Sequence, residues 1–260
     1  MKTVILAGGL GTRITEETNT KPKPMITIGN KPLIWHIMKI YSNFGINEFI
    51  ICCGYKGYVI KEYFSNYFLH SSDVTFHMDE DNRMEIHSRK YEPWKVTLVD
   101  TGDKTETGGR LKRVKDFLKN ETFCFTYGDG LANVNIKDLI NSHIKSKKLV
   151  TLTAVQPPGR FGALNLENNT VKNFQEKPEG DNAWINGGFF VINPKAIDNI
   201  KNDSTSWEVD LLPLLAQASE LNAFKHYDFW QPMDTLRDKI KLEELSLKDK
   251  PPWFNFSNEV

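Results

Sequence analysis

Short apolar runs alternate with amphipathic stretches along the first third of the chain. Residues 3–6 and 48–53 are dense in aliphatic and small apolar side chains, which is typical of strands buried on both faces of a sheet. Residues 31–44 and 58–67 carry apolar side chains three and four positions apart, which predicts helices. The order strand, loop, helix, strand, helix indicates the beginning of a parallel sheet covered by helices on both faces.

The rest of the chain extends this pattern and interrupts it twice. Apolar periodicity and apolar runs predict further helices and strands at residues 94–100, 111–118, 123–127, 138–147, 149–155, 206–218, 221–227 and 236–247. Polar turns divide residues 74–87 and 163–174 into pairs of short strands, which predicts two β-hairpins. We therefore expect an α/β fold with a mostly parallel central sheet, helices on both faces and β-hairpin excursions. His143 is expected to face solvent, and the tail from Pro251 onward to be loosely packed.

Composition narrows the choice of partners and compartment. Lys plus Arg and Asp plus Glu number 33 each, so the overall charge gives no indication of nucleic acid or an anionic membrane as partner. We expect neither a signal peptide nor a membrane span, because the apolar runs are too short. The three cysteines, Cys52, Cys53 and Cys124, lie in apolar runs without metal-ligand spacing, and their odd number fits a reducing compartment. A cytoplasmic protein is the expectation.

The stretch that follows the first predicted strand has the residue types of a phosphate-binding loop. It reads Leu6, Ala7, Gly8, Gly9, Leu10, Gly11, Thr12 and Arg13. Its small residues let the backbone turn tightly and let a ligand lie on backbone N–H groups. Arg13 adds a forked cation that suits phosphate oxygens, and Lys21-Pro22-Lys23-Pro24 adds two more cations on a stiff backbone. The pattern indicates a site for several phosphates.

Other kinds of loop share some of these residues. An ordinary strand-to-loop connection would also use glycines. The Rossmann dinucleotide fingerprint needs a third glycine where this chain has Ile14, and no helical pattern begins cleanly there. A Walker loop needs a Gly-Lys-Ser/Thr sequence, which does not follow. A nucleoside triphosphate therefore fits better than a dinucleotide.

Two further stretches carry polar chemistry. Residues 100–110 form a second glycine-rich loop that ends in Gly108-Gly109-Arg110 at the beginning of a predicted helix, where free N–H groups favour acceptors. A flexible linker would have a similar composition. The predicted strand 123–127 ends in Gly128-Asp129-Gly130, which places a carboxylate at a strand end. Such tripeptides also form simple turns, but beside a triphosphate loop one aspartate suits Mg²⁺.

Together with Glu176-Lys177-Pro178 and Asn186-Gly187-Gly188, these motifs resemble those of the sugar-1-phosphate nucleotidylyltransferases, and the resemblance covers nearly the whole chain. It implies the Rossmann-like fold of nucleotide-diphospho-sugar transferases. The similarity is strongest to members that use CTP and glucose 1-phosphate, above all at residues 229–238. It therefore implies CDP-glucose and pyrophosphate as products, and Mg²⁺ as cofactor.

The resemblance also implies roles for individual residues. Nucleotide contacts are implied for the whole first loop, Leu6 to Arg13, and for Lys23, Lys104, Gly109, Arg110, Tyr127 and Gly128. Sugar-phosphate contacts are implied for Tyr127, Gly162, Glu176, Lys177, Asn186, Gly187 and Gly188. Asp129 and Asp234 are the implied metal ligands, although Asp234 also fits the N-cap of the following helix. The implied catalytic set is Arg13, Lys23, Lys177 and Asp129, which would neutralise charge during attack on the α-phosphorus.

The expected organisation is a single domain, residues 1–260. The nucleotide-binding half covers about 1–130, the sugar-binding half about 131–235, and a C-terminal helix about 235–248. Residues 71–99, with Tyr91 and Trp94 exposed, are expected to make subunit contacts, and the family implies a homo-oligomer, a hexamer in the nearest relatives.

Three rival interpretations remain open. The same chemistry could use UTP, dTTP or GTP, because base choice rests on the resemblance alone. The chain could instead be a nucleotide-sensing module, although a sensor needs no paired carboxylates. A nicotinamide-binding oxidoreductase fits less well, because the third glycine is missing.

Overall fold

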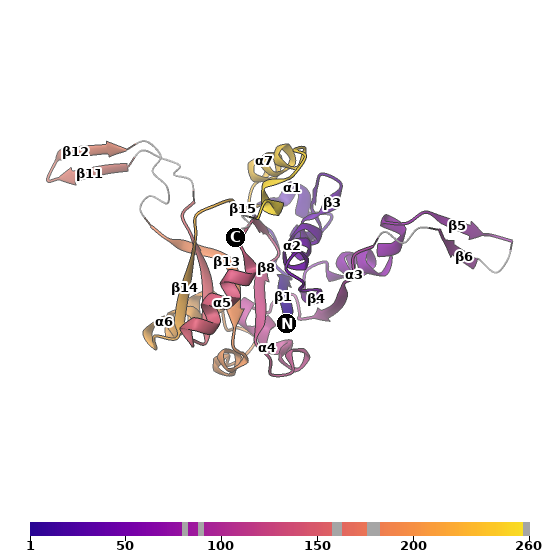
Figure 1. Cartoon of the computed structure of the whole chain (residues 1–260), viewed down its shortest axis with the longest axis horizontal. Coiled ribbons are helices and arrows are strands. Elements are labelled where there is room, and N and C mark those ends of the chain that lie inside the picture. Colours follow the sequence, from indigo (N-terminus) through magenta and orange to yellow (C-terminus); the bar gives the residue numbers. More distant parts are fainter. Residues whose placement is uncertain (80–82, 88–90, 158–162, 176–182, 257–260) are drawn as a thin grey trace.

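The computed structural model describes residues 1–79, 83–87, 91–157, 163–175 and 183–256. A seven-stranded sheet in the order β14-β10-β13-β8-β1-β4-β7 forms its centre (Figure 1). In chain order these strands are β1 (Lys2–Ala7), β4 (Glu48–Cys53), β7 (Lys95–Asp100), β8 (Phe123–Tyr127), β10 (Val150–Val155), β13 (Ile185–Ile192) and β14 (Leu221–His226). Only β13 runs antiparallel to its neighbours, β8 and β10, so the sheet is mostly parallel, as predicted.

The register of the central strands brings their carboxyl ends together. Ala7 at the end of β1 lies opposite Cys53 of β4, and Leu6 lies opposite Tyr127 of β8. The loops that follow these strands therefore leave the sheet at one edge, where an open α/β sheet usually binds its ligand.

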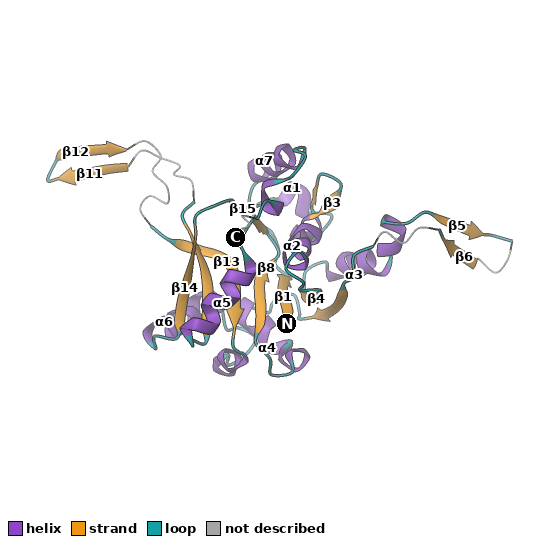
Figure 2. Cartoon of the chain, in the orientation of Figure 1, coloured by secondary structure: helices purple, strands orange, loops and turns teal. Residues whose placement is uncertain are grey.

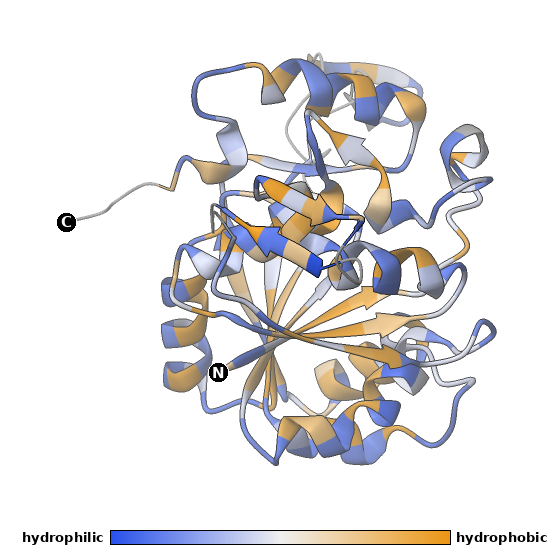
Figure 3. Ribbon diagram, turned by 90° about the vertical axis from the view of Figure 1, so that its right-hand side faces the viewer, coloured by the Kyte–Doolittle hydropathy of each residue, from blue (hydrophilic) through white to orange (hydrophobic). Residues whose placement is uncertain are grey.

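Successive side chains of β1 point to opposite faces of the sheet, and each face has its own apolar core. Ile5 lies in one core and Val4 in the other. The first core is covered by α2 (Leu33–Ser42), α3 (Gly57–Ser65), α5 (Ile136–Ser146) and α7 (Leu236–Ser246). The second is covered by α4 (Thr107–Arg113) and α6 (Leu212–Gln217). Figure 3 shows apolar residues concentrated along the central strands, with apolar and polar residues alternating on the surrounding helices.

Shorter elements complete the chain. The additional strand pairs are β2 (Thr27–Ile28) with β3 (Lys31–Pro32), β5 (Val74–His77) with β6 (Arg83–Ile86), β9 (Gly130–Ala132) with β15 (Trp230–Pro232), and β11 (Ala163–Glu167) with β12 (Thr170–Gln175). Helical turns are α1 (Thr15–Thr18), Lys23–Met25, Tyr67–His70, Lys115–Leu118, Pro194–Asn199, Trp207–Leu211 and Pro252–Phe254. The hairpins β5–β6 and β11–β12 project from opposite sides of the sheet, which confirms both predicted excursions (Figures 1 and 2).

Three local predictions were wrong, each because tertiary packing has no signature in the local sequence. His143 is buried and its Nδ1 lies 3.0 Å from the Thr151 hydroxyl. Trp253 in the tail is fully buried, and its indole N–H donates to His36. Trp94 is half-buried, with its ring 5.8 Å from Phe49 and 5.9 Å from Tyr67.

The cysteine prediction is confirmed, because Cys52, Cys53 and Cys124 are free and buried. Burial raises the pKa of Cys53 to about 11 and that of Cys124 to about 12, so both stay thiols. In the part of the chain that the structure describes, no helix is long and apolar enough to cross a membrane.

Candidate active site

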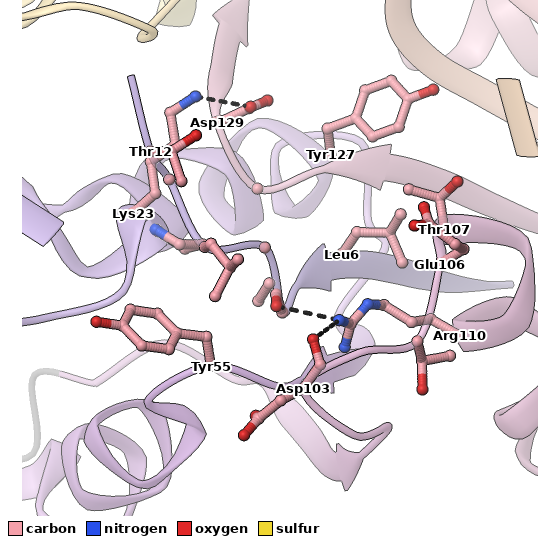
Figure 4. Close-up of a pocket in the computed structure, with 18 of the residues that line it drawn as sticks. Leu6, Thr12, Lys23, Tyr55, Asp103, Glu106, Thr107, Arg110, Tyr127 and Asp129 are labelled. Carbon is pink, nitrogen blue, oxygen red and sulfur yellow. Dashed lines mark hydrogen bonds and ion pairs between the residues drawn. The ribbon is translucent and has the colours of Figure 1, made fainter. Parts of the chain in front are cut away.

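A cleft of about 630 Å³ lies at the carboxyl edge of the sheet (Figure 4). The first glycine-rich loop and Lys23 line it on one side, residues 103–107 and Arg110 on the other, and Tyr127, Gly128 and Asp129 close its end. Every residue predicted for nucleotide binding lines this cleft except Gly109. Segments that are distant in sequence are therefore brought together around one site.

The glycines of the first loop differ in whether the fold requires a residue without a side chain at their position. A Cβ atom on Gly8 would lie 2.0 Å from Nη1 of Arg110. Gly11 has a φ of +64°, and a Cβ there would lie 2.7 Å from Cγ2 of Thr18. A Cβ on Gly9, by contrast, would meet no protein atom within 4 Å, so the fold itself does not require glycine there. Gly9 is exposed at the cleft, where a small residue leaves room for a ligand.

Four charged side chains meet at the mouth of the cleft. The Lys23 ammonium donates to Asp129 over 2.9 Å and to Asp234 over 2.6 Å. Arg13 donates to the second oxygen of Asp234 over 2.9 Å. The Lys23 side chain is only 10% exposed, whereas the carboxylates of Asp129 and Asp234 are 37% and 25% exposed. Two acids from distant parts of the sequence thus share one buried cation and still face solvent.

Pairing between β9 and β15 brings these two acids together. Gly130 lies opposite Pro232, and the Asp129 carbonyl accepts the N–H of Met233 over 2.7 Å. Asp234 then follows directly. The two predicted metal ligands are therefore neighbours in space because two short strands pair.

The alternative role considered for Asp234, as the N-cap of the next helix, is wrong. Thr235 is the N-cap of α7, and Asp238 completes a capping box with it. Asp238 also accepts the backbone N–H of Asp234 over 3.1 Å. Because Thr235 and Asp238 satisfy the helix terminus, the carboxylate of Asp234 is left to contact Lys23 and Arg13.

The residues present fit a divalent cation. Two carboxylates already converge on one positive group, and carboxylate oxygens are the donors that hard cations prefer. No group of three or more His, Cys, Asp or Glu that could hold a metal occurs among the described residues. The two carboxylates suit a hard divalent cation that keeps some of its waters.

Arg110 joins the two glycine-rich loops. Its guanidinium donates to the carbonyl of Gly8 over 3.1 Å, to the carbonyl of Gly102 over 2.8 Å and to the Thr101 hydroxyl over 2.8 Å. It is buried, and this burial lowers its pKa. The predicted contact of Arg110 with the nucleotide stays a prediction. The structure shows that the Arg110 guanidinium connects the backbone of the first loop, at Gly8, to that of the second, at Gly102. Figure 4 shows Arg110 beside Asp103 of the second loop.

The other two residues of this loop that are predicted to contact the nucleotide differ in their surroundings. Lys104 is exposed on the cleft wall. Gly109 lies behind that wall, with its N–H donating to the carbonyl of Thr205, and a Cβ there would lie 2.5 Å from the carbonyl oxygen of Asp203. Gly109 therefore permits close packing of the loop against residues 203–205.

A small recess beside the cleft holds the described sugar-side residues. Asn186, Gly187 and Gly188 line it, and it shares Tyr127 and Asp129 with the cleft. Gly188 has a φ of +82°, and a Cβ there would lie 2.8 Å from the Tyr127 ring. Of the other predicted sugar-phosphate residues, Gly162, Glu176 and Lys177 lie outside the described residues.

Sequence reasoning missed two contacts of this recess. The indole N–H of Trp230 donates to the Gly187 carbonyl over 2.8 Å, which holds the backbone of the recess. Glu208 accepts the hydroxyl of Tyr127 over 2.6 Å. Neither role has a local signal, because each depends on a partner far along the chain.

The sequence of this chain is similar to a family model and to curated proteins. The family model described as Nucleotidyl transferase matches residues 2–238. The chain is 65% identical over 254 residues to the glucose-1-phosphate cytidylyltransferase of Salmonella typhi, covering 97% of this chain and 98% of the relative. It is 42% identical over 254 residues to a probable glucose-1-phosphate cytidylyltransferase of Bacillus subtilis (strain 168), covering 97% and 99%.

Solved structures support the same fold. HddC from Yersinia pseudotuberculosis superposes with a TM-score of 0.67 at 24% identity, over 94% of this chain and 98% of that chain. The match to the family model and the 65% identity to a curated relative show that the chain belongs to the nucleotidyl transferase family.

Proposed function

We propose that this protein is a glucose-1-phosphate cytidylyltransferase, which converts CTP and glucose 1-phosphate to CDP-glucose and pyrophosphate. The observation that carries the proposal is the paired carboxylate cluster of Asp129 and Asp234 around Lys23, in which Asp129 lines both the cleft and the recess. The identity of 65% to a curated cytidylyltransferase supports CTP and glucose 1-phosphate as the substrates.

The reaction requires two anions to meet. A phosphate oxygen of glucose 1-phosphate forms a bond to the α-phosphorus of CTP, and the bond from that phosphorus to the bridging oxygen breaks. The electron pair leaves with pyrophosphate. The attacking phosphate already carries a charge of about −1.5 to −2 at neutral pH, so no general base is needed. The protein's task is positioning and neutralisation of charge.

The residues around the cleft can divide this task. Arg13 and the N–H groups of the first loop would stabilise the leaving pyrophosphate, and Lys23 would hold the triphosphate near its α-phosphate. Lys177 is proposed to hold the sugar phosphate, and Asn186 the sugar hydroxyls.

Asp129 and Asp234 are proposed to hold Mg²⁺. When bound, the ion would supply Lewis-acid charge at the α-phosphate. The Lys23 ammonium ends a flexible four-carbon stem, so it can turn from the carboxylates to the triphosphate. Its position between the two acids supports their use by a shared cation.

A panel of four triphosphates tests the function and the base together. CTP, UTP, dTTP and GTP are each incubated with glucose 1-phosphate and Mg²⁺, pyrophosphate release is followed, and the sugar nucleotide is identified by mass. We expect CDP-glucose as the main product. Faster turnover with another triphosphate would contradict the base assignment, and nucleotide binding without pyrophosphate release would favour a sensing module.

Arg13→Ala provides a second test. Removing a cation that acts mainly in the transition state should lower turnover with CTP by roughly 10²- to 10³-fold. Unchanged turnover would remove Arg13 from the mechanism.

We further propose a homo-oligomer, a hexamer, in the cytoplasm. The hairpin β5–β6 projects from the sheet with Phe76 and Met78 exposed, which supports a subunit contact there. The three free, buried cysteines support a reducing compartment. Light scattering coupled to size-exclusion chromatography would measure the mass, and a monomer of 29.9 kDa would contradict the oligomer.

A further inference from the structure

Glu208 accepts three hydroxyl hydrogen bonds beside the recess. Tyr127 donates to one of its carboxylate oxygens over 2.6 Å. Thr107 and Ser206 donate to the other, over 2.5 Å and 3.1 Å. Tyr127 and Thr107 both line the nucleotide cleft, whereas Glu208 does not. Glu208 therefore lies outside the cleft and accepts hydrogen bonds from two residues that line it.

The same network extends to the sugar side. The Asn186 amide N–H₂ donates to the Tyr127 oxygen over 3.2 Å, and its carbonyl oxygen accepts the N–H of Gly188 over 2.9 Å. Because a backbone N–H can only donate, the amide oxygen of Asn186 must face Gly188 and its nitrogen must face Tyr127. The network thus runs from Thr107 through Glu208 and Tyr127 to Asn186.

The carboxylate of Glu208 determines the direction of the three hydroxyl bonds that it accepts. An ionised carboxylate is an acceptor only, so the hydroxyl proton of Tyr127 must point to Glu208. The lone pairs of the Tyr127 oxygen are then available to Asn186. Burial, followed by the nearby charge of Glu208, raises the pKa of Tyr127, so the phenol keeps its proton. A donor group in place of the Glu208 oxygen would turn the Tyr127 hydroxyl away and weaken its contact with Asn186.

The backbone at Glu208 is firmly held. The preceding residue, Trp207, is fully buried, with its ring 5.6 Å from that of Phe125 and 5.9 Å from that of Phe190. The backbone N–H of Trp207 donates to the Thr107 hydroxyl over 2.9 Å. Among the described residues, no lysine or arginine forms an ion pair with Glu208. The polar contacts of its carboxylate in the described part of the chain are the hydrogen bonds from Tyr127, Thr107 and Ser206.

We propose that Glu208 is a positioning residue for the sugar-phosphate subsite, acting through Tyr127 on Asn186. The proposal rests on the cytidylyltransferase function proposed above. Its main effect would be on recognition of glucose 1-phosphate, because Asn186 lies in the recess and not in the nucleotide cleft. A smaller effect on CTP is expected, because Thr107 and Tyr127 also line the nucleotide cleft.

Glu208→Gln is the main test. Glutamine has one acceptor oxygen, so it cannot accept from Tyr127 on one side and from Thr107 and Ser206 on the other. We expect the KM for glucose 1-phosphate to rise about tenfold, the change that corresponds to about one net hydrogen bond. The KM for CTP should rise less than the KM for glucose 1-phosphate. Glu208→Asp, which keeps both acceptor oxygens, should recover part of the loss.

Asp210→Asn is the matched control. Asp210 lies in the same helical turn and accepts the Ser206 N–H over 2.7 Å, yet it is exposed and does not line the cleft or the recess. It should leave both KM values unchanged. If it raised the KM for glucose 1-phosphate as much as Glu208→Gln does, the effect would be one of turn stability and the proposal would be overturned.

A double-mutant cycle with Tyr127→Phe tests the route of the effect. If Glu208 acts through the Tyr127 hydroxyl, Glu208→Gln should cause no further rise of the KM for glucose 1-phosphate in the Tyr127→Phe background. Additive effects, or equal rises in both KM values, would overturn the proposal while the unsubstituted protein still makes CDP-glucose. Failure of the unsubstituted protein to make CDP-glucose would instead refute the proposed function, and the positioning role with it.

Discussion

Replacement of Lys23 by methionine tests the charge cluster at the mouth of the cleft. Methionine keeps the length of the apolar stem and removes the ammonium that contacts Asp129 over 2.9 Å and Asp234 over 2.6 Å. The two carboxylates would then face each other without their shared buried cation, although Arg13 still contacts Asp234. The structure therefore predicts a less stable protein with a stronger response to divalent ions.

The expected loss of stability depends on how far the three charged side chains are exposed to solvent. Exposed ion pairs contribute about 0–1 kcal/mol, and breaking a buried pair costs about 3–5 kcal/mol. Lys23 is 10% exposed, but its partners are 37% and 25% exposed, so water regains part of their solvation. We expect a loss of about 2 kcal/mol in the free energy of unfolding. For a chain of this size that corresponds to a fall in Tm of about 4–8 °C.

Thermal unfolding in EDTA and in millimolar Mg²⁺, without nucleotide, measures both effects. In EDTA the variant should show the lower Tm. Mg²⁺ should raise the Tm of the variant more than that of the wild type, because no ammonium competes for the carboxylates. Turnover should fall roughly 10²- to 10³-fold.

Lys21→Met is the control for this experiment. The Lys21 ammonium lies 3.8 Å from Glu17 and contacts neither aspartate, so its loss should leave the response to Mg²⁺ as in the wild type. The reasoning would be refuted if Lys23→Met kept the wild-type Tm in EDTA, or if Mg²⁺ raised the Tm of wild type and variant equally.

Three further substitutions test other parts of the structure. Gly8→Ala should lower both Tm and turnover, because its Cβ would lie 2.0 Å from Nη1 of Arg110; a wild-type Tm would contradict the tight contact. Gly9→Ala should keep the wild-type Tm and raise the KM for CTP, because only a ligand would meet its Cβ; a lowered Tm would contradict this. Burial lowers the pKa of His36 from its ordinary value of 6.5 to about 4, so the folded state disfavours the protonated ring. Stability should therefore fall as pH drops from about 6.5 towards 4, and His36 alone should contribute about 2 kcal/mol of loss between pH 7 and 5. Urea unfolding should show a smaller loss over this interval for His36→Gln, and an unchanged pH dependence would contradict the buried neutral state.

Local signals predicted much of the site. The first loop is recognisable from its glycines, and Asp129 from its place at the end of a buried strand, because each depends only on nearby residues. The alternation of strands and helices likewise predicted a mostly parallel sheet, which the structure confirms. The division into a nucleotide-binding half and a sugar-binding half, at about residue 130, stays a prediction.

Features that depend on distant partners could not be predicted in this way. Nothing in the sequence around Asp234 indicates that β15 pairs with β9, which is what brings Asp234 beside Asp129. His143 and Trp253 are buried by elements far along the chain, and Glu208 gains its role from Tyr127. Physical reasoning from the sequence did not identify the distant neighbours of these side chains.

The central claim is that Asp129 and Asp234 hold one divalent ion at the reacting phosphates. Anomalous diffraction from crystals soaked with CDP-glucose and Mn²⁺ tests it most directly. We predict one manganese peak within about 2–2.5 Å of a carboxylate oxygen from each aspartate and of a phosphate oxygen of the ligand. A peak beside the phosphates but more than about 4 Å from both carboxylates would contradict it.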